Sequence, residues 1–182
     1  MSFADDDPDI GEILLTADQI QTRIGELGAQ LTEEYRGRTP LLVCVLKGSY
    51  VFVADLARAI DLPVELDFIA VSSYGSSTRT SGVVRLVKDL DSDIAGRDVI
   101  LIEDIVDSGL TLRYLRRNLE ARNPASLAVC TLIARKSADI ESLDVGYVGF
   151  TIADEDWLVG YGLDVGQRFR NLAHLAKYIK PE

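Results

Sequence analysis

The sequence predicts an α/β domain with a mostly parallel, twisted sheet that is flanked by helices. Two observations support this fold class. First, continuous apolar and β-branched runs at 41–46, 98–103 and 126–134 are typical of strands that are buried on both faces. Second, stretches with apolar residues at helical spacing separate these runs, which is the pattern of strand-helix-strand units. The chain has 182 residues without an internal repeat or a long Gly/Ser/Pro linker, so one domain is expected.

Composition and charge narrow the classes of partner. The chain is 47% apolar and 26% charged, which is ordinary for a globular protein. Its 19 Lys and Arg against 29 Asp and Glu give a formal net charge of −10. This charge disfavours binding to nucleic acid or to an anionic membrane. An anionic small molecule would therefore be held by local groups, namely backbone N–H groups, a few Lys or Arg side chains, or Mg²⁺.

The N-terminus and the cysteines predict a cytoplasmic protein. Residues 1–9 are acidic, lack the basic start of a signal peptide and are expected to be flexible, so the folded domain is expected over 10–182. No apolar stretch reaches the roughly 20 residues that span a bilayer. Cys44 and Cys130 lie inside apolar runs and are predicted to be buried free thiols rather than a disulfide.

The first half of the chain predicts two strand-helix units. Residues 10–15 are a short apolar lead-in, and Thr16 with Gln19 has the spacing of a capping box at the start of a helix over 17–35. The strand at 41–46 precedes a helix over about 49–60. A second strand is expected at 64–71.

A hydroxyl- and glycine-rich loop follows, over about 72–82. A loop of this length inside a compact domain is more often functional than idle. Because 83–90 alternates between apolar and polar residues, loop and flanking strands are expected to form a long hairpin.

The second half predicts further strands around one helix. Leu112, Leu115 and Leu119 line one face of a helix after the strand at 98–103. The strand at 126–134 follows, then a short strand at 147–150. The segment 156–164 is apolar with glycines and acids, and the tail at 169–179 is mixed.

The most informative stretch is the end of the 98–103 strand. Glu103 and Asp104 stand at the carboxyl end of that strand, where ligands bind in open α/β sheets. Side chains alternate along a strand, so the two acids should project to different sides while the strand continues. Both could reach sugar hydroxyls or a hydrated Mg²⁺, which needs only one or two carboxylates. The alternative is a solvated turn or a helix cap.

Residues 107–111 have the composition of an anion-binding nest. Gly109 allows close backbone approach, while Ser108 and Thr111 add hydroxyl donors to the N–H groups of a helix start. A plain Ser or Thr N-cap is the alternative, but it explains only one hydroxyl. Asp107 would repel a phosphate, so we expect it to face a proton on a second substrate. A Walker loop is excluded because Gly-Lys-Ser/Thr does not occur.

These motifs together resemble a known family. The span 103–111 resembles the phosphoribosyl-diphosphate-binding signature of the type I phosphoribosyltransferases. Leu46-Lys47-Gly48, Ser73-Tyr74-Gly75, Lys136 and 157–164 are similar to segments of its 6-oxopurine branch, the hypoxanthine and hypoxanthine-guanine phosphoribosyltransferases. The similarity runs from about residue 10 to residue 172. It implies transfer of a phosphoribosyl group to a purine base, with release of pyrophosphate.

The resemblance also implies architecture and partners. It implies the type I phosphoribosyltransferase fold, with a small hood from residues near both termini and a flexible lid. It further implies Mg²⁺ as cofactor, a 6-oxopurine and phosphoribosyl diphosphate as substrates, and a homodimer or homotetramer.

The resemblance assigns the following roles to residues at the phosphate-binding end of the site. Glu103 and Asp104 would hold the ribose hydroxyls and the Mg²⁺ shell. Lys47 and Gly48 would contact pyrophosphate, and the peptide bond before this lysine is often cis in the family. A solvated cation is the alternative for Lys47. The substrate-binding residues of the nest would be Ile105, Asp107, Ser108, Gly109, Leu110 and Thr111.

The base-binding end is assigned in the same way. Lys136 would donate to the purine 6-oxo group and so disfavour adenine. Trp157 would stack on the purine, with an ordinary core aromatic as the alternative, and the Leu158 backbone would accept from the base edge. Arg135 is expected to be a surface or ion-pair residue. Asp164 would bind a second Mg²⁺, and Arg170 would contact pyrophosphate.

The resemblance implies catalytic roles for four residues: Asp107, Lys136, Ser73 and Tyr74. Asp107 would exchange a proton with purine N7. Ser73 and Tyr74 would lie on the lid and exclude water from an oxocarbenium-like transition state.

Two other functions compete with the transferase. A phosphoribosyl-diphosphate-binding regulator of the same fold would need only the nest, and Asp107, Lys136 and Tyr74 argue against it. An acid-pocket phosphotransfer domain would want its acids on different strands. His174 is the only histidine and is expected to be structural, so zinc chemistry is unsupported.

Overall fold

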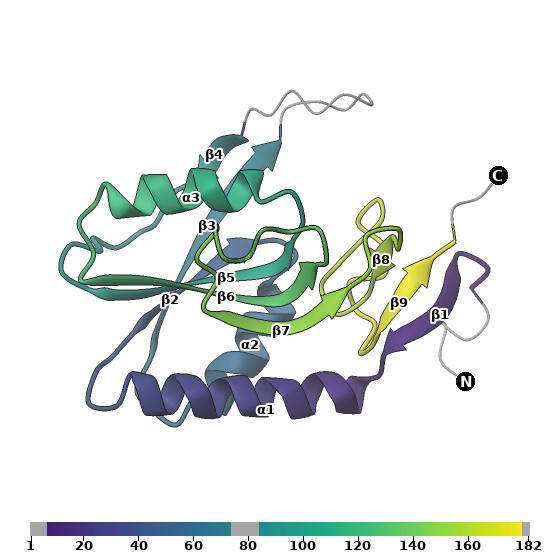
Figure 1. The fold of residues 1–182 in the computed structure, drawn as a ribbon, viewed down its shortest axis with the longest axis horizontal. Helices are drawn as coiled ribbons and strands as arrows, with labels where there is room; N and C mark the ends of the chain where they lie inside the picture. Colours follow the sequence, from purple (N-terminus) through teal and green to yellow (C-terminus); the bar gives the residue numbers. More distant parts are fainter. Residues whose placement is uncertain (1–6, 74–83, 180–182) are drawn as a thin grey trace.

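A six-stranded sheet and a three-stranded sheet form the protein (Figure 1). The computed structural model describes residues 7–73 and 84–179. The elements in chain order are β1 (Ile10–Leu15), α1 (Ala17–Glu34), β2 (Leu41–Leu46), α2 (Tyr50–Ala59), β3 (Glu65–Ser73), β4 (Val84–Lys88), β5 (Asp98–Val106), α3 (Leu110–Glu120), β6 (Ser126–Arg135), β7 (Tyr147–Ile152), β8 (Leu158–Val159) and β9 (Leu175–Tyr178).

The large sheet confirms the predicted fold class. Its strand order is β4-β3-β2-β5-β6-β7, and every pair is parallel except the antiparallel hairpin of β3 and β4. Helices α1 and α2 lie on one face and α3 on the other (Figure 1). From β2 the chain builds toward β4, and from β5 it builds the opposite way toward β7. The neighbours β2 and β5 therefore mark the switch point, where α/β sheets bind ligands.

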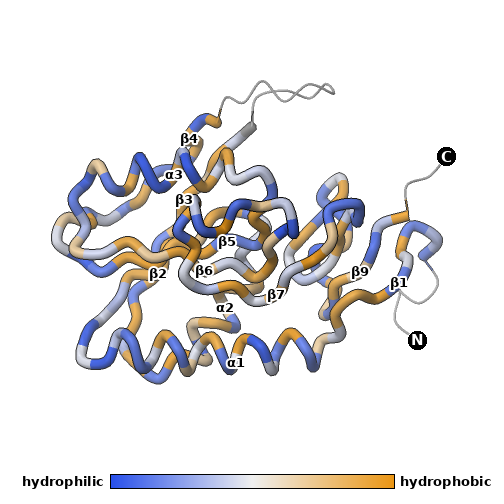
Figure 2. Tube along the Cα trace, viewed as in Figure 1, coloured by the Kyte–Doolittle hydropathy of each residue, from blue (hydrophilic) through white to orange (hydrophobic). Residues whose placement is uncertain are grey.

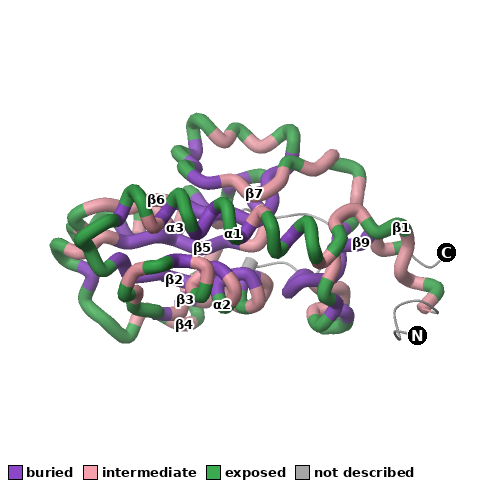
Figure 3. The backbone as a smooth tube through the Cα atoms, turned by 90° about the horizontal axis from the view of Figure 1, so that it is seen from below, coloured by how far each residue is buried: buried purple, intermediate pink, exposed green. Residues whose placement is uncertain are grey.

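The apolar strand runs are buried on both faces, as expected. Leu42, Cys44 and Ile102 pack in the core under α1 and α2, whereas Val43 and Leu101 pack in a second core under α3. The central strands are accordingly hydrophobic in Figure 2 and buried in Figure 3. This two-faced burial explains why β2 and β5 read as continuous apolar runs rather than alternating ones.

Both cysteines are buried free thiols, as predicted. Cys44 and Cys130 lie in the core beneath α1 and α2. Burial raises the pKa of each thiol to about 12. They are therefore unreactive apolar core residues at neutral pH.

The helix starts differ in how they are capped. Thr16 and Gln19 form the predicted capping box at α1. At α3 the N-cap is Gly109, with a left-handed φ of 75° and no side-chain cap hydrogen bond. The plain Ser or Thr cap is therefore wrong, because Ser108 precedes the cap and Thr111 lies inside the first turn.

The segments near the two ends of the chain meet in the small sheet, whose order is β1-β9-β8. The apolar lead-in at 10–15 and part of the mixed tail are thus paired strands. The predicted loop over about 72–82, including Tyr74, lies largely outside the described residues. No helix in the described ranges has the length and apolar character needed to cross a membrane.

Candidate active site

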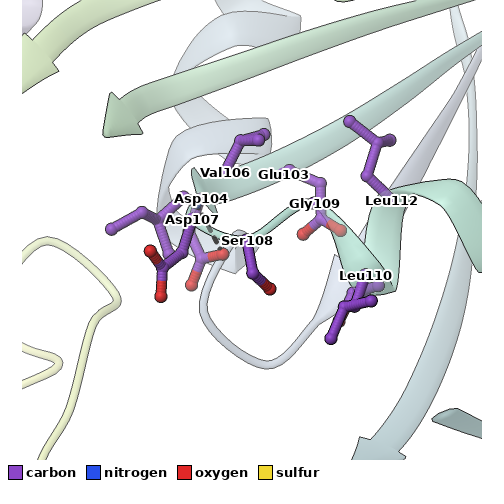
Figure 4. Close-up of a pocket in the computed structure, with 10 residues that line it drawn as sticks. Glu103, Asp104, Val106, Asp107, Ser108, Gly109, Leu110 and Leu112 are labelled. Atoms are coloured by element: carbon purple, nitrogen blue, oxygen red, sulfur yellow. Dashed lines mark hydrogen bonds between the residues drawn. The ribbon is translucent and has the colours of Figure 1, made fainter. Parts of the chain in front are cut away.

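The two adjacent acids occupy opposite faces of the end of β5. This strand continues to Val106, three residues beyond the predicted end, so Glu103 and Asp104 still alternate. Figure 4 shows the Glu103 carboxylate beside the Gly109 turn and the Asp104 carboxylate on the other side, near Asp107. The two side chains therefore lie on different sides of the strand end, as the alternation predicted.

Both carboxyls are held in an environment that favours the neutral form. Glu103 is only 5% exposed, and burial together with the charge of Asp104 raises its pKa well above the ordinary value. Burial raises the pKa of Asp104 to about 6, opposed by backbone N–H groups, including that of Ile105, and by the charge of Arg170. Neither acid forms a salt bridge with a side chain in the described part of the chain. An added cation would therefore offset an unfavourable negative charge.

The turn after β5 forms a nest of backbone donors at the start of α3. Residues 107–109 make the turn, and the first helical N–H groups have no intrahelical acceptor. Besides its φ, Gly109 leaves room for a neighbouring side chain, since an added Cβ would lie 2.7 Å from Cδ1 of Leu143. The hollow over this turn has a volume of about 300 Å³ and is lined by Glu103, Asp104, Ile105, Val106, Asp107, Ser108, Gly109, Leu110, Thr111 and Leu112.

The end of β2 contributes a second backbone surface beside Asp104. The Leu46–Lys47 peptide bond is cis, as the family resemblance implied. Gly48 lies directly against Asp104, and the Gly48 carbonyl oxygen is 2.0 Å from the place where a Cβ of Gly162 would be. Gly48, Gly162 and the Asp104 side chain, from three segments that are far apart in sequence, therefore meet here. A Cβ on Gly162 would collide with backbone, and a Cβ on Gly48 would collide with the Asp104 carboxylate.

Arg170 holds the loop after β8 in place beside the end of β2. It donates through Nη1 to the Gly162 carbonyl at 2.7 Å and pairs through Nη2 with Asp164 at 2.6 Å. The Gln167 backbone N–H donates to the other Asp164 oxygen at 2.7 Å. Lys47 lies 3.4 Å from the Gln167 side-chain oxygen. The predicted residues Lys47, Asp164 and Arg170 are thus brought together.

A second hollow adjoins the first and shares Ile105 and Asp107 with it. Its volume is about 370 Å³, within the range of small-molecule sites. Trp157 lies on its lining with 59% of its surface exposed, so the alternative of a core aromatic is wrong. The remaining lining residues are Arg135, Asp154, Glu155, Asp156, Leu158, Leu163 and Asp164.

The end of β6 carries Arg135 and Lys136, and Arg135 lies differently from the expectation. Arg135 is 9% exposed and donates to two backbone carbonyls, so its assignment as a surface or ion-pair residue is wrong. Its burial depends on acceptors about 20 residues later in the chain, which no local pattern shows. Lys136 is exposed, and its backbone N–H donates to Ile152.

The remaining predicted residues are placed only in part. Ser73 ends β3, and Tyr74 lies outside the described residues. Gln167 and Leu143 were missed, because their contacts with Lys47 and Gly109 come from loops without a motif. Leu158 is buried in β8, as a backbone role would allow.

The donor set fits a magnesium ion completed by substrate oxygens. The described residues contain no group of three His, Cys, Asp or Glu that would hold a metal alone. Mg²⁺ needs only one or two carboxylates besides water and substrate. Glu103 and Asp104, which are buried and form no salt bridge with a described side chain, meet that requirement.

Comparison with known proteins agrees with this geometry. The family model of the phosphoribosyl transferase domain matches residues 12–165. The chain is 56% identical over 173 residues to a hypoxanthine-guanine phosphoribosyltransferase of Mycobacterium bovis, covering 92% of this chain and 85% of that one. It is 46% identical over 170 residues to a hypoxanthine phosphoribosyltransferase of Salmonella typhimurium, covering 92% and 95%.

The same likeness is found among solved structures. The crystal structure of a hypoxanthine phosphoribosyltransferase of Staphylococcus aureus has a TM-score of 0.88 and 40% identity, over 94% of this chain and 92% of that one.

Proposed function

Because the chain belongs to the phosphoribosyltransferase family, we propose that its two joined hollows bind the substrates of purine salvage. The enzyme transfers the 5-phosphoribosyl group of 5-phospho-α-D-ribose 1-diphosphate to N9 of hypoxanthine or guanine. The products are IMP or GMP and pyrophosphate. One observation carries the assignment of the hollows: Asp107 lines both, so a single carboxylate borders the anion nest and the neighbouring pocket.

The chemistry of the lining residues suggests which part of the sugar diphosphate each group of residues would bind. The nest of 107–111 would hold the 5′-phosphate, while Glu103 and Asp104 would hold the ribose hydroxyls. Lys47, Gly48 and Arg170 would contact the pyrophosphate group. A chain with a net charge of −10 needs such local donors to bind an anionic sugar.

The reaction would need a group beside the purine that accepts one proton. N9 of the purine forms a bond to C1′ of the sugar while the bond from C1′ to the pyrophosphate oxygen breaks. The purine then loses its N7 proton, and Asp107 would accept it. Its position between the hollows explains why an acid stands in an anion nest.

Mg²⁺ would be held by Glu103 and Asp104, with Asp164 near a second ion. When bound, the metal would neutralise charge on the diphosphate. The two buried acids whose negative charge is disfavoured support this assignment. In this structure both Asp164 oxygens already accept from Arg170 or Gln167, so water would complete its link to an ion.

The pocket beside Trp157 would bind the purine. Trp157 would stack on the ring, and Leu158 would accept from its edge through the backbone. Lys136 would donate to the 6-oxo group, so adenine, whose 6-amino group is itself a donor, should bind poorly.

Three further properties are proposed alongside. Ser73 and Tyr74 would close over the reacting centre and exclude water. The family resemblance favours a homodimer or homotetramer. The family and the buried free thiols favour a cytoplasmic location.

A direct assay tests the function. Purified protein with hypoxanthine, phosphoribosyl diphosphate and Mg²⁺ should form IMP and pyrophosphate in equal amounts. Protein that binds the sugar diphosphate but forms no nucleotide with hypoxanthine or guanine would contradict it. The non-catalytic regulator gains no support, since the matched relatives are named as transferases.

A further inference from the structure

Arg135 joins the two ends of the turn that forms one wall of the second hollow. Its Nη1 donates to the Ala153 carbonyl at 2.5 Å, and its Nη2 donates to the Asp156 carbonyl at 2.6 Å. The side chain is buried, yet it forms no salt bridge with a described residue. A buried guanidinium whose donors bond two backbone carbonyls constrains the conformation of the backbone between them.

The turn held by Arg135 leads directly into Trp157. Asp154, Glu155 and Asp156 line the hollow together with Trp157, so this segment is a continuous wall. Trp157 is 59% exposed on this wall, and the path of the backbone through residues 153–156 sets where its ring lies.

Other contacts fix the same segment at single points. Ser137 donates from its backbone and its hydroxyl to Asp154, and Lys177 pairs with Asp156 at 3.0 Å. The Tyr178 N–H donates to the Trp157 carbonyl at 2.7 Å. Only Arg135, among the described residues, bonds both ends of the turn through one planar group. That group sets the distance between residues 153 and 156.

We propose that Arg135 is a positioning residue for base binding, which holds Trp157 at the rim of the pocket by closing the 153–156 turn. The proposal rests on the proposed function of that pocket. Arg135 need not touch the purine for this role. It follows that the side chain should matter for the base and not for the sugar diphosphate, which binds in the other hollow.

Steady-state kinetics test the role. Arg135→Met keeps the apolar length of the side chain and removes both hydrogen bonds. We expect its KM for hypoxanthine to rise about tenfold, with the KM for phosphoribosyl diphosphate changed less than about twofold. Arg135→Lys can reach only one carbonyl and should lie between the wild type and Arg135→Met.

Arg23 offers a matched control. It also donates to two backbone carbonyls, those of Gly149 at 2.9 Å and Val148 at 2.8 Å, but it lies on α1 and lines neither substrate hollow. Arg23→Met should leave the KM for hypoxanthine unchanged. If the KM for hypoxanthine rose as much in Arg23→Met as in Arg135→Met, the effect would come from a general loss of rigidity. That result would overturn the proposal.

A second readout does not require catalysis. Trp157 is the only tryptophan of the chain, so the fluorescence anisotropy decay of the free protein reports this residue alone. Arg135→Met should add a fast component from a mobile ring, and Arg23→Met should not. If Arg135→Met does not fold by circular dichroism, Arg135→Lys decides by the same measurement.

The outcomes separate the two proposals. If Trp157 became mobile in Arg135→Met but the kinetics did not change, Arg135 would still be shown to hold the turn. Its role in base binding would be refuted. A folded Arg135→Met with wild-type anisotropy and wild-type KM for hypoxanthine would overturn the inference. Absence of catalysis in the wild type would instead contradict the proposed function, while the anisotropy would still test the clamp.

Discussion

Gly48 and Asp104 are in such close contact that a Cβ on residue 48 would lie 1.5 Å from Oδ2 of Asp104. No side chain can occupy that place unless the acid or the loop moves. The contact joins the end of β2 to the end of β5 at the switch point of the sheet. It therefore places the loop after β2 against the acid that would bind the metal and ribose.

Gly48→Ala should damage the site through this overlap. We expect kcat/KM for phosphoribosyl diphosphate to fall at least about tenfold, and the free energy of unfolding to fall by about 1–3 kcal/mol. Both quantities follow from enzyme assays and urea unfolding. Gly25→Ala is the control, because a Cβ there meets nothing within 4 Å and alanine favours the helix. Wild-type activity in Gly48→Ala would show that Asp104 can be displaced without consequence.

Gly109 and Leu143 form a second contact of this kind. Gly109→Ala would place a Cβ 2.7 Å from Leu143 and would keep an unfavourable φ of 75°. We expect a loss of stability of about 1–3 kcal/mol and weaker binding of inorganic phosphate.

A double mutant separates the two causes at Gly109. Leu143→Ala removes the collision but not the strain in φ, at its own cost of about 2–5 kcal/mol as a buried leucine. The loss in Gly109→Ala with Leu143→Ala should be smaller than the sum of the single losses by at least about 0.5 kcal/mol. Strict additivity would mean that the collision does not matter.

The raised pKa of Asp104 predicts a stability change with pH in metal-free protein. Its pKa is about 6 in the folded state against an ordinary 3.8, so the folded state binds more protons between these values. The favourable contribution is complete below pH 4 and is lost as the pH rises to about 6. The difference between these two pKa values corresponds to about 3 kcal/mol of folding free energy.

Urea unfolding with a chelator at several pH values would measure this loss. Asp104→Asn cannot ionise, so it should match the wild type near pH 4 and exceed its stability at pH 7. Asp139→Asn should show the opposite sign, because hydrogen bonds from Ser142 lower the pKa of Asp139. If Asp104→Asn and the wild type lost the same stability as the pH rises, Asp104 would not be the group responsible.

The sequence predicted the fold class and the strand end where Glu103 and Asp104 lie, because its apolar patterns reflect which strand faces are buried. The runs at β2 and β5 are apolar on both faces, and alternation along β5 separates Glu103 from Asp104. Arg135 was misassigned because its acceptors are backbone atoms of another segment. The resemblance implied a hood from residues near both termini, but the residue pattern alone did not show that β1 pairs with β9, since each short strand gains its partner only in the folded chain.

Lys136 should determine the choice of base. Lys136→Gln replaces a cationic donor with an amide that can also accept, so the preference for hypoxanthine over adenine should fall about tenfold or more. Ratios of kcat/KM for the two bases would measure it. Arg117→Gln, an exposed cation on α3, should leave the ratio unchanged. An unchanged ratio in Lys136→Gln would remove this lysine from base recognition.

Asp107 should matter for turnover more than for binding. Asp107→Asn keeps the shape of the side chain but cannot accept the N7 proton, so kcat should fall about 10²–10⁴-fold. The dissociation constant for phosphoribosyl diphosphate, measured by calorimetry with Mg²⁺, should change little because the backbone donors of the nest remain. Asp18→Asn, an exposed acid at the start of α1, should leave both quantities unchanged. If Asp107→Asn kept wild-type kcat and instead bound the sugar diphosphate more tightly, its carboxylate would act only by repelling the phosphate.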